Sequence, residues 1–215
     1  MKRLFVVLVV VLAASCATVE RRLPLEDATA AWELRQSRLN TVKVWDIQGR
    51  LSARTPNEGW QASLRWVRDN ERHHIDLWGP LGRGHVRLIQ DHSGATLQDA
   101  DLNTYWAENG QQLLFDTTGY WLPLDGLNYW VLGVPVPELP GQHALDELGR
   151  LKTLQQLGWD IRFLRYKRAG VHEFPSKVFI RRRLNERGRE LRRDGNSNAP
   201  TLEVRLIIER WTLKP

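Results

Sequence analysis

Residues 45–66, with the sequence WDIQGRLSARTPNEGWQASLRW, decide the fold class of this chain. Apolar and polar side chains alternate on both sides of a central stretch, residues 55–59, that is rich in Pro, Asn and Gly. A period of two places alternate side chains on one face of a β-strand, so each half predicts a strand with one apolar face. These faces comprise Trp45, Ile47, Gly49, Leu51 and Ala53 in the first strand, and Trp60, Ala62, Leu64 and Trp66 in the second.

The same alternation recurs along the rest of the chain. After a turn expected at residues 68–71, it predicts strands at residues 73–78, 85–90, 95–98, 104–107, 151–155, 159–166, 177–183 and 202–211. Short strands joined by tight turns favour an antiparallel, meander-like sheet over βαβ units.

Two helices are expected beside the strands. The first covers residues 26–39, where one mostly apolar side carries Ala28, Ala31, Trp32, Arg35 and Leu39. The second begins near residue 125 and ends before Gly133, and Pro135 prevents its continuation. The chain is therefore expected to be a β-rich α+β protein, with one curved sheet that is apolar on its concave side and wet outside. The pattern leaves open whether side chains fill that concave side or leave it open to a ligand.

The N-terminus predicts a signal peptide at residues 1–15. Lys2 and Arg3 precede an apolar run of eleven residues, 4–14, which as a helix spans about 16 Å, roughly half a bilayer core. Cys16 follows small residues, an arrangement that resembles the lipobox of bacterial lipoproteins and implies acyl chains on this cysteine. The alternative is an ordinary secretory leader with an incidental cysteine. Residues 16–25 are then expected to form a lipidated tether, and residues 26–215 a single domain.

Charge is concentrated near the C-terminus. Without the leader, the formal charge falls from +6 to +4, because the leader carries two of the 31 basic residues and none of the 25 acidic ones. Residues 181–200 hold seven arginines against Glu186, Glu190 and Asp194, a net charge of 7 − 3 = +4. This segment is expected to be a basic loop, either simply solvated or attracted to anionic phospholipid. A nucleic-acid partner is not expected.

No pattern indicates catalysis. The chain has no G-x-S-x-G motif, and its only cysteine is the expected lipidation site. His73 and His74 are adjacent in a predicted strand and therefore point to opposite faces, which favours solvated histidines over a metal site. We expect no enzyme activity, no metal and no cofactor beyond the acyl chains on Cys16.

A turn between two predicted strands carries an unusual leucine. Residues 79–84 have the sequence GPLGRG, and Gly79, Pro80 and Gly82 suit a turn, whereas Leu81 does not. Leaving a leucine in water forgoes about 1.5–3 kcal/mol of burial. Leu81 is therefore expected either to fold back onto the core or to meet a membrane or bound lipid.

Residues 122–135, with the sequence LPLDGLNYWVLGVP, resemble the signature of the LolB family of outer-membrane lipoprotein receptors. Residues 48–51 at the first strand, Trp66, the turn at residues 79–82 and the last strand near Trp211 agree with that family in the same order. The resemblance covers most of the chain after Cys16. The basic segment at residues 181–200 departs from it, because the family's loop there is usually short.

The resemblance implies an incomplete antiparallel β-barrel whose few helices cover an apolar cavity. It implies a lipid-anchored protein on the periplasmic side of the outer membrane of a Gram-negative bacterium. Such a protein accepts acylated lipoproteins from the carrier LolA and inserts them into the inner leaflet, with the leucine carried here by Leu81 taking part in insertion. The expected acyl cavity is lined by Trp45, Leu51, Leu64, Trp66, Ile75, Leu77, Val86, Leu88 and Trp130.

Two other functions remain open on the sequence. One is a lipid-anchored scaffold for envelope assembly that has no ligand cavity. The other is the soluble carrier itself, which shares the fold but has no anchor. We expect the protein to be a monomer.

Overall fold

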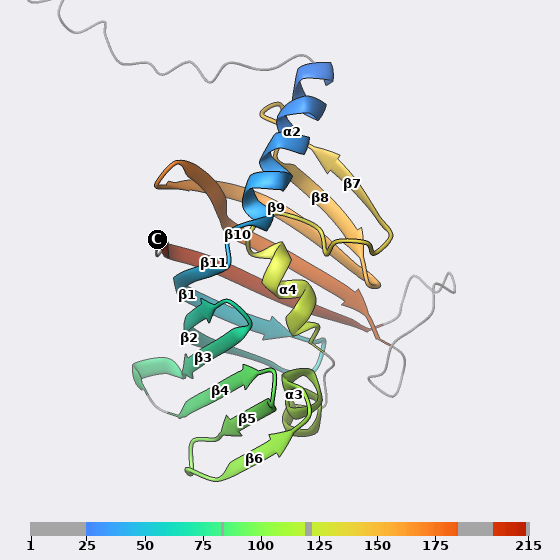
Figure 1. Ribbon diagram of the computed structural model, residues 1–215. Coiled ribbons are helices and arrows are strands. Elements are labelled where there is room, and N and C mark those ends of the chain that lie inside the picture. Colours follow the sequence, from blue (N-terminus) through green and yellow to red (C-terminus); the bar gives the residue numbers. More distant parts are fainter. Residues whose placement is uncertain (1–24, 83, 119–121, 185–199, 214–215) are drawn as a thin grey trace, which may run out of the picture.

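A computed structural model of the chain describes residues 25–82, 84–118, 122–184 and 200–213, which form one large sheet with helices on one face (Figure 1). The predicted signal peptide, Cys16, almost all of the tether and most of the predicted basic loop lie outside these residues. The strands are β1 (Val44–Arg54), β2 (Gly59–Asp69), β3 (Arg72–Trp78), β4 (His85–Asp91), β5 (Gly94–Gln98), β6 (Thr104–Ala107), β7 (Gly141–Leu145), β8 (Leu151–Gln156), β9 (Trp159–Ala169), β10 (His172–Arg183) and β11 (Thr201–Leu213). The helices are α2 (Leu25–Asn40), α3 (Gly110–Thr118) and α4 (Leu124–Trp130).

The sheet brings the first and last strands of the domain together at its centre. Its order is β6-β5-β4-β3-β2-β1-β11-β10-β9-β8-β7, and neighbouring strands run antiparallel. The chain works outward from β1 to the β6 edge and passes through α3 and α4 to the opposite edge. It then returns from β7 to β11. Within the described residues the edge strands β6 and β7 do not pair, so the sheet is an incomplete barrel, as expected.

Side-chain alternation in the central hairpin is as the sequence predicts. Ile47 of β1 lies opposite Trp66 of β2, and both are buried on the concave face. Arg65, the neighbour of Trp66 in β2, points to the outer face and is exposed. The strand faces therefore follow directly from the period of two in the sequence.

Gly49 marks the junction between β1 and β11. The register shifts there by a β-bulge between Gln48 and Gly49. A Cβ atom at residue 49 would overlap the backbone carbonyl oxygen of Ile207 in β11. Only glycine fits where the two halves of the sheet approach so closely.

The helices lie on the concave side of the sheet (Figure 1). Ala28, Trp32 and Leu39 of α2 are buried, which confirms the predicted apolar side of that helix. Gly133 has φ +79°, and its N–H donates to the carbonyl of Trp130, so it ends α4 as expected. None of the described helices is both long and apolar enough to cross a membrane.

Two elements were not predicted from the sequence. Helix α3 is only nine residues long, and its main local signal is Asn109, whose Oδ1 accepts from the N–H of Gln112 at 2.8 Å. Strand β7 is an edge strand whose first four residues are exposed, so it has no alternation of burial to read. The C-terminal strands are as expected, except that β10 begins at His172, five residues before the predicted start; it ends at Arg183 as predicted, so the first residues of the predicted basic loop lie in the sheet.

Candidate functional site

An aromatic cluster forms the centre of the concave face. Trp45 is fully buried and packs edge-on against Trp66 at 5.2 Å between ring centroids and against Trp211 at 5.7 Å. Trp211 in turn stacks on Phe174 of β10 at 4.3 Å. The cluster therefore spans the junction between the two halves of the sheet.

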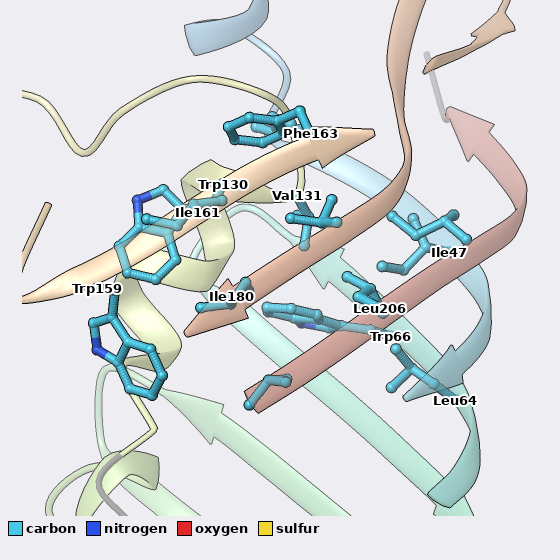
Figure 2. Packing of buried hydrophobic residues seen from close by; sticks show 14 of the residues in the cluster. Ile47, Leu64, Trp66, Trp130, Val131, Trp159, Ile161, Phe163, Ile180 and Leu206 are labelled. Carbon is cyan, nitrogen blue, oxygen red and sulfur yellow. The ribbon is translucent and has the colours of Figure 1, made fainter. Parts of the chain in front are cut away.

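Side chains from α4 and from both halves of the sheet meet over this centre. Figure 2 shows Val131 after α4, Ile180 of β10, Leu206 of β11 and Trp66 of β2 converging on one space. All four belong to a single hydrophobic cluster. Residues of the segment that resembles the family signature thus cover the centre of the concave face.

The nine predicted cavity residues all belong to this one hydrophobic cluster or pack against it, eight of them from the concave face of the sheet and Trp130 from α4. Six are buried in the cluster, namely Trp45, Leu64, Trp66, Ile75, Leu88 and Trp130. Three are half-buried and pack against it, namely Leu51, Leu77 and Val86. The structure brings the set together, and its binding of acyl chains remains a prediction.

Exposure along the concave face increases toward the turn that carries Leu81. Ile75 and Leu88 face each other in β3 and β4 and are buried. One pair closer to the turn, Leu77 and Val86 face each other and are half-buried. Trp60, on the same face at the far end of β2, is 39% exposed. The apolar layer is therefore most accessible beside the turn.

Arg68 ties α4 to the concave face, although the sequence placed this residue in a turn. It lies in β2, is 5% exposed, and donates from Nη1 to Oδ1 of Asn128 in α4 at 2.9 Å. Its Nε donates to the carbonyl of Asn70 at 2.7 Å. Burial lowers the pKa of Arg68 from its ordinary value, and within the described residues it forms no ion pair with a carboxylate. The sequence gives no signal for this burial, because Arg68 is simply an arginine beside a predicted turn.

Gln156 holds the other end of α4. It is buried at the end of β8, and its Oε1 accepts from Trp130 Nε1 at 3.1 Å and from the N–H of Val136 at 2.9 Å. Its Nε2 donates to the carbonyls of Val136 and Leu139. The Gln156 amide therefore forms hydrogen bonds both with the Trp130 indole and with the backbone that follows α4. Buried polar groups with all partners present stabilise one arrangement of a core.

His73 differs from the solvated histidine that the sequence predicts. It lies on the concave face opposite Arg68, and Trp66 Nε1 donates to its Nδ1 at 3.2 Å. Burial, with a smaller contribution from the Arg68 charge, lowers the pKa of His73 from 6.5 to about 4. His74 points to the other face, as expected, and lies beside Asp76. Among the described residues, no group of three His, Cys, Asp or Glu side chains could hold a metal ion.

This pKa predicts a loss of stability in acid. The folded pKa of His73 is about 4, below the ordinary 6.5, so the unfolded chain takes up this proton first as pH falls. The contribution of His73 to the free energy of unfolding is complete above pH 6.5 and is lost toward pH 4. By pH 4.5 the loss is about 2 kcal/mol. In urea unfolding at pH 7 and pH 4.5, the wild type is expected to lose about 2 kcal/mol more than His73→Gln, which keeps an acceptor for Trp66. Equal losses in the two proteins would contradict the assignment.

The turn between β3 and β4 projects from the sheet and exposes its leucine. Leu81 is 94% exposed and has φ +60° and ψ +24°, a left-handed conformation that L-residues avoid. The turn is closed by Gly82 N–H donating to the carbonyl of Gly79 at 3.0 Å. Leu81 therefore does not fold back onto the core. Both its exposure and its backbone conformation cost free energy.

The base of this turn is firmly held. Trp78 and His85 flank the turn and stack with their rings 4° from parallel and 5.2 Å apart. Asp76 accepts from His85 at 2.6 Å and from Arg87 at 2.8 Å. Burial opposes ionisation of Asp76, but the hydrogen bonds from Arg87 and His85 outweigh it and lower its pKa. A rigid base thus presents an exposed apolar tip.

A family match and two named relatives agree on one family. The family described as outer membrane lipoprotein LolB matches residues 43–211, which include the central hairpin, the Leu81 turn and α4. A protein of Nitrosococcus oceani named outer-membrane lipoprotein LolB is 33% identical, over 98% of this chain and 98% of its own length. A protein of the same name from Pseudomonas aeruginosa is 30% identical, over 93% of this chain and 90% of its own.

A solved structure shares the fold at much lower identity. The crystal structure of a DUF1329 family protein from Desulfovibrio piger matches with a TM-score of 0.50 and 9% identity. The match covers 89% of this chain and 94% of that protein. At this identity it shows the fold alone.

Proposed function

Because this chain belongs to the LolB family of outer-membrane lipoproteins, we propose that it receives acylated lipoproteins from the periplasmic carrier LolA and inserts them into the outer membrane. The acyl chains would be held on the concave face of the sheet, beneath α4, and released into the inner leaflet beside Leu81. The observation that carries the proposal is the apolar face, which becomes more accessible along β3 and β4 toward the turn that exposes Leu81.

The energetics explain why such a face is needed. Moving one acyl methylene from hydrocarbon to water costs about 0.8 kcal/mol, so three chains of roughly 15 methylenes cost about 36 kcal/mol. No spontaneous crossing of an aqueous compartment overcomes that cost. A protein that shelters the chains at each step replaces it with a series of small differences in affinity, from the carrier to this protein and then to the bilayer.

A displacement assay tests whether the concave face binds acyl chains. A soluble form, residues 17–215, keeps every residue of the hydrophobic cluster, which begins at Trp32. It is expected to bind a fluorescent fatty acid saturably, and unlabelled fatty acid should displace the probe. Leu77→Trp, at the accessible end of the face, should weaken binding at least tenfold, because the larger ring occupies the space that the chain needs.

Leu164→Trp is the matched control, since Leu164 is 45% exposed on the opposite face of its strand from the buried Phe163. Its affinity for the probe should equal that of the wild type. Absence of saturable binding by the wild type would reject the acyl-binding role and favour a lipid-anchored scaffold with a filled core.

Labelling with radioactive palmitate tests the proposed anchor at Cys16. The wild type should incorporate palmitate and fractionate with the outer membrane. Cys16→Ala should incorporate none, because the thiol is the only acceptor of this kind in the chain. Equal labelling of the two proteins would show that acylation, if any, occurs elsewhere. An unlabelled wild type would fit an ordinary secretory leader or the soluble carrier.

A further inference from the structure

A groove on the outer face of the sheet lies directly beneath the Leu81 turn. Its volume is about 580 Å³, within the range of sites for small ligands. It is formed by β1, β2, β11 and the turn, and its lining includes Arg50, Ser52, Ser63 and Arg205. These residues alternate along their strands with the concave-facing Leu51, Leu64 and Leu206, so the groove lies on the outer face of the sheet, and Leu51 also contributes to its lining.

Two arginines provide positive charge to the groove. Arg205 lies opposite Ser52 and Ile207 lies opposite Arg50, so the two arginines are diagonal neighbours on adjacent strands, about 7–8 Å apart at the backbone. Both are exposed; the Arg205 guanidinium lies over the Phe179 ring, 5.0 Å from its centroid, and has to leave this contact to meet a ligand together with Arg50. A guanidinium fork matches two phosphate oxygens in geometry and charge.

The carboxylate partners of these arginines leave capacity for an anion. Arg50 pairs with Glu209 at 2.9 Å, but the two side chains are 65% and 56% exposed, and such pairs contribute little. Arg205 pairs with Glu203 at 3.3 Å, and Arg181 contacts the same carboxylate at 2.7 Å. Of the described residues that line the groove, Arg50 and Arg205 are charged and none is acidic.

The wall nearest the turn is apolar. Trp78, Pro80 and Leu81 line this side. Trp78 is held in place by its stacking on His85. Tryptophan suits a boundary between apolar and wet surroundings, because its ring is apolar and its N–H is polar. The groove therefore has a cationic floor and an apolar wall that ends at the exposed leucine. This arrangement is complementary to a phospholipid, whose charged headgroup lies next to its apolar chains.

We propose that this groove binds the phosphate of an anionic phospholipid headgroup of the membrane that the Leu81 turn enters. This inference rests on the proposed function. It adds that binding of a lipid phosphate orients the protein on the bilayer. Arg50 and Arg205 bind the phosphate oxygens, and Ser52, Gln61 and Ser63 supply hydroxyl and amide groups around the rest of the headgroup. The lipid's chains run along the apolar wall, so Leu81 points into the leaflet.

Titration with a short-chain lipid tests the site without a membrane. Dihexanoylphosphatidylglycerol, kept below its micelle concentration, is added to the soluble form, residues 17–215, and binding is followed by calorimetry. The wild type should bind saturably, and Arg50→Gln/Arg205→Gln should bind at least tenfold more weakly. Arg165→Gln/Arg168→Gln removes the same charge from exposed positions on β9 that do not line the groove, and should change binding less than twofold.

Three outcomes would overturn the proposal. Absence of saturable binding rejects the site, and equal weakening in both double variants shows general attraction by charge. Competition by inorganic phosphate as strong as that of the lipid shows a simple anion site.

Fatty-acid displacement in the same proteins separates this inference from the proposed function. If the fatty acid binds and the short-chain lipid does not, only the headgroup site fails. If the lipid binds and the fatty acid does not, the acyl-transfer role fails.

Discussion

Leu81→Glu is expected to abolish insertion of lipoproteins into membranes while leaving their transfer from the carrier intact. Leu81 is 94% exposed at the tip of a firmly held turn, so its replacement changes no packing inside the domain. Insertion of the leucine into hydrocarbon contributes about 1.5–3 kcal/mol, and a carboxylate there costs about 2.5–3.5 kcal/mol. Together these effects predict a decrease of at least a hundredfold in insertion.

The measurement uses carrier loaded with a lipoprotein, to which this protein and then vesicles are added. Transfer is scored as lipoprotein bound to this protein, and insertion as lipoprotein in the vesicles. Leu102→Glu is the matched control, because Leu102 is 74% exposed, lies in the turn between β5 and β6, and shares a left-handed backbone with φ +66°. It should insert lipoproteins as the wild type does. If Leu81→Glu inserts lipoproteins normally, the turn has no role in insertion and only connects two strands.

Gly49→Ala is expected to have the largest effect on stability of any single methyl addition in the central hairpin. The new Cβ would overlap the carbonyl oxygen of Ile207, which belongs to the backbone and cannot rotate away. The strands β1 and β11 must then separate or shift at the junction of the two halves of the sheet. We expect a loss of about 2–3 kcal/mol, which lowers Tm by about 5–10 °C in a domain of this size.

Gly59→Ala is the control for this substitution. A Cβ at residue 59 has its nearest neighbour, the carbonyl oxygen of Ala53, at 3.4 Å, which is an ordinary contact. Thermal unfolding followed by circular dichroism should give a Tm close to that of the wild type. A similar Tm for Gly49→Ala would show that the bulge relaxes around the added methyl group.

Much of the fold could be predicted because most strands are apolar on one face only. The alternation in β1 and β2 identified the concave residues, and the same signal located the strands of the C-terminal half. Strand β7 was not predicted, because an exposed edge strand buries neither face and so shows no alternation. Helix α3 escaped because nine residues hold too few turns for a clear helical period, although Asn109 offered a capping signal.

The candidate site was predictable to a smaller extent. The resemblance of residues 122–135 to the LolB signature pointed to the helix that covers the concave face, and the composition of the turn singled out Leu81. Arg68 and His73 were assigned to a turn and to solvent, because a charged or polar residue near a strand end is usually exposed. Their burial depends on Asn128 and Trp66, which the fold alone brings beside them.

The sequence by itself determined which residues form the apolar face, because the period of a strand is a local property of the chain. It also marked where the strands turn, since Gly, Pro and Asn act on the backbone at their own positions. The tertiary structure decided which strands meet, in particular that β1 pairs with β11 and that Gly49 must accommodate this contact. It also decided that Leu81 projects while Arg68 is buried, because exposure depends on what the rest of the chain places nearby.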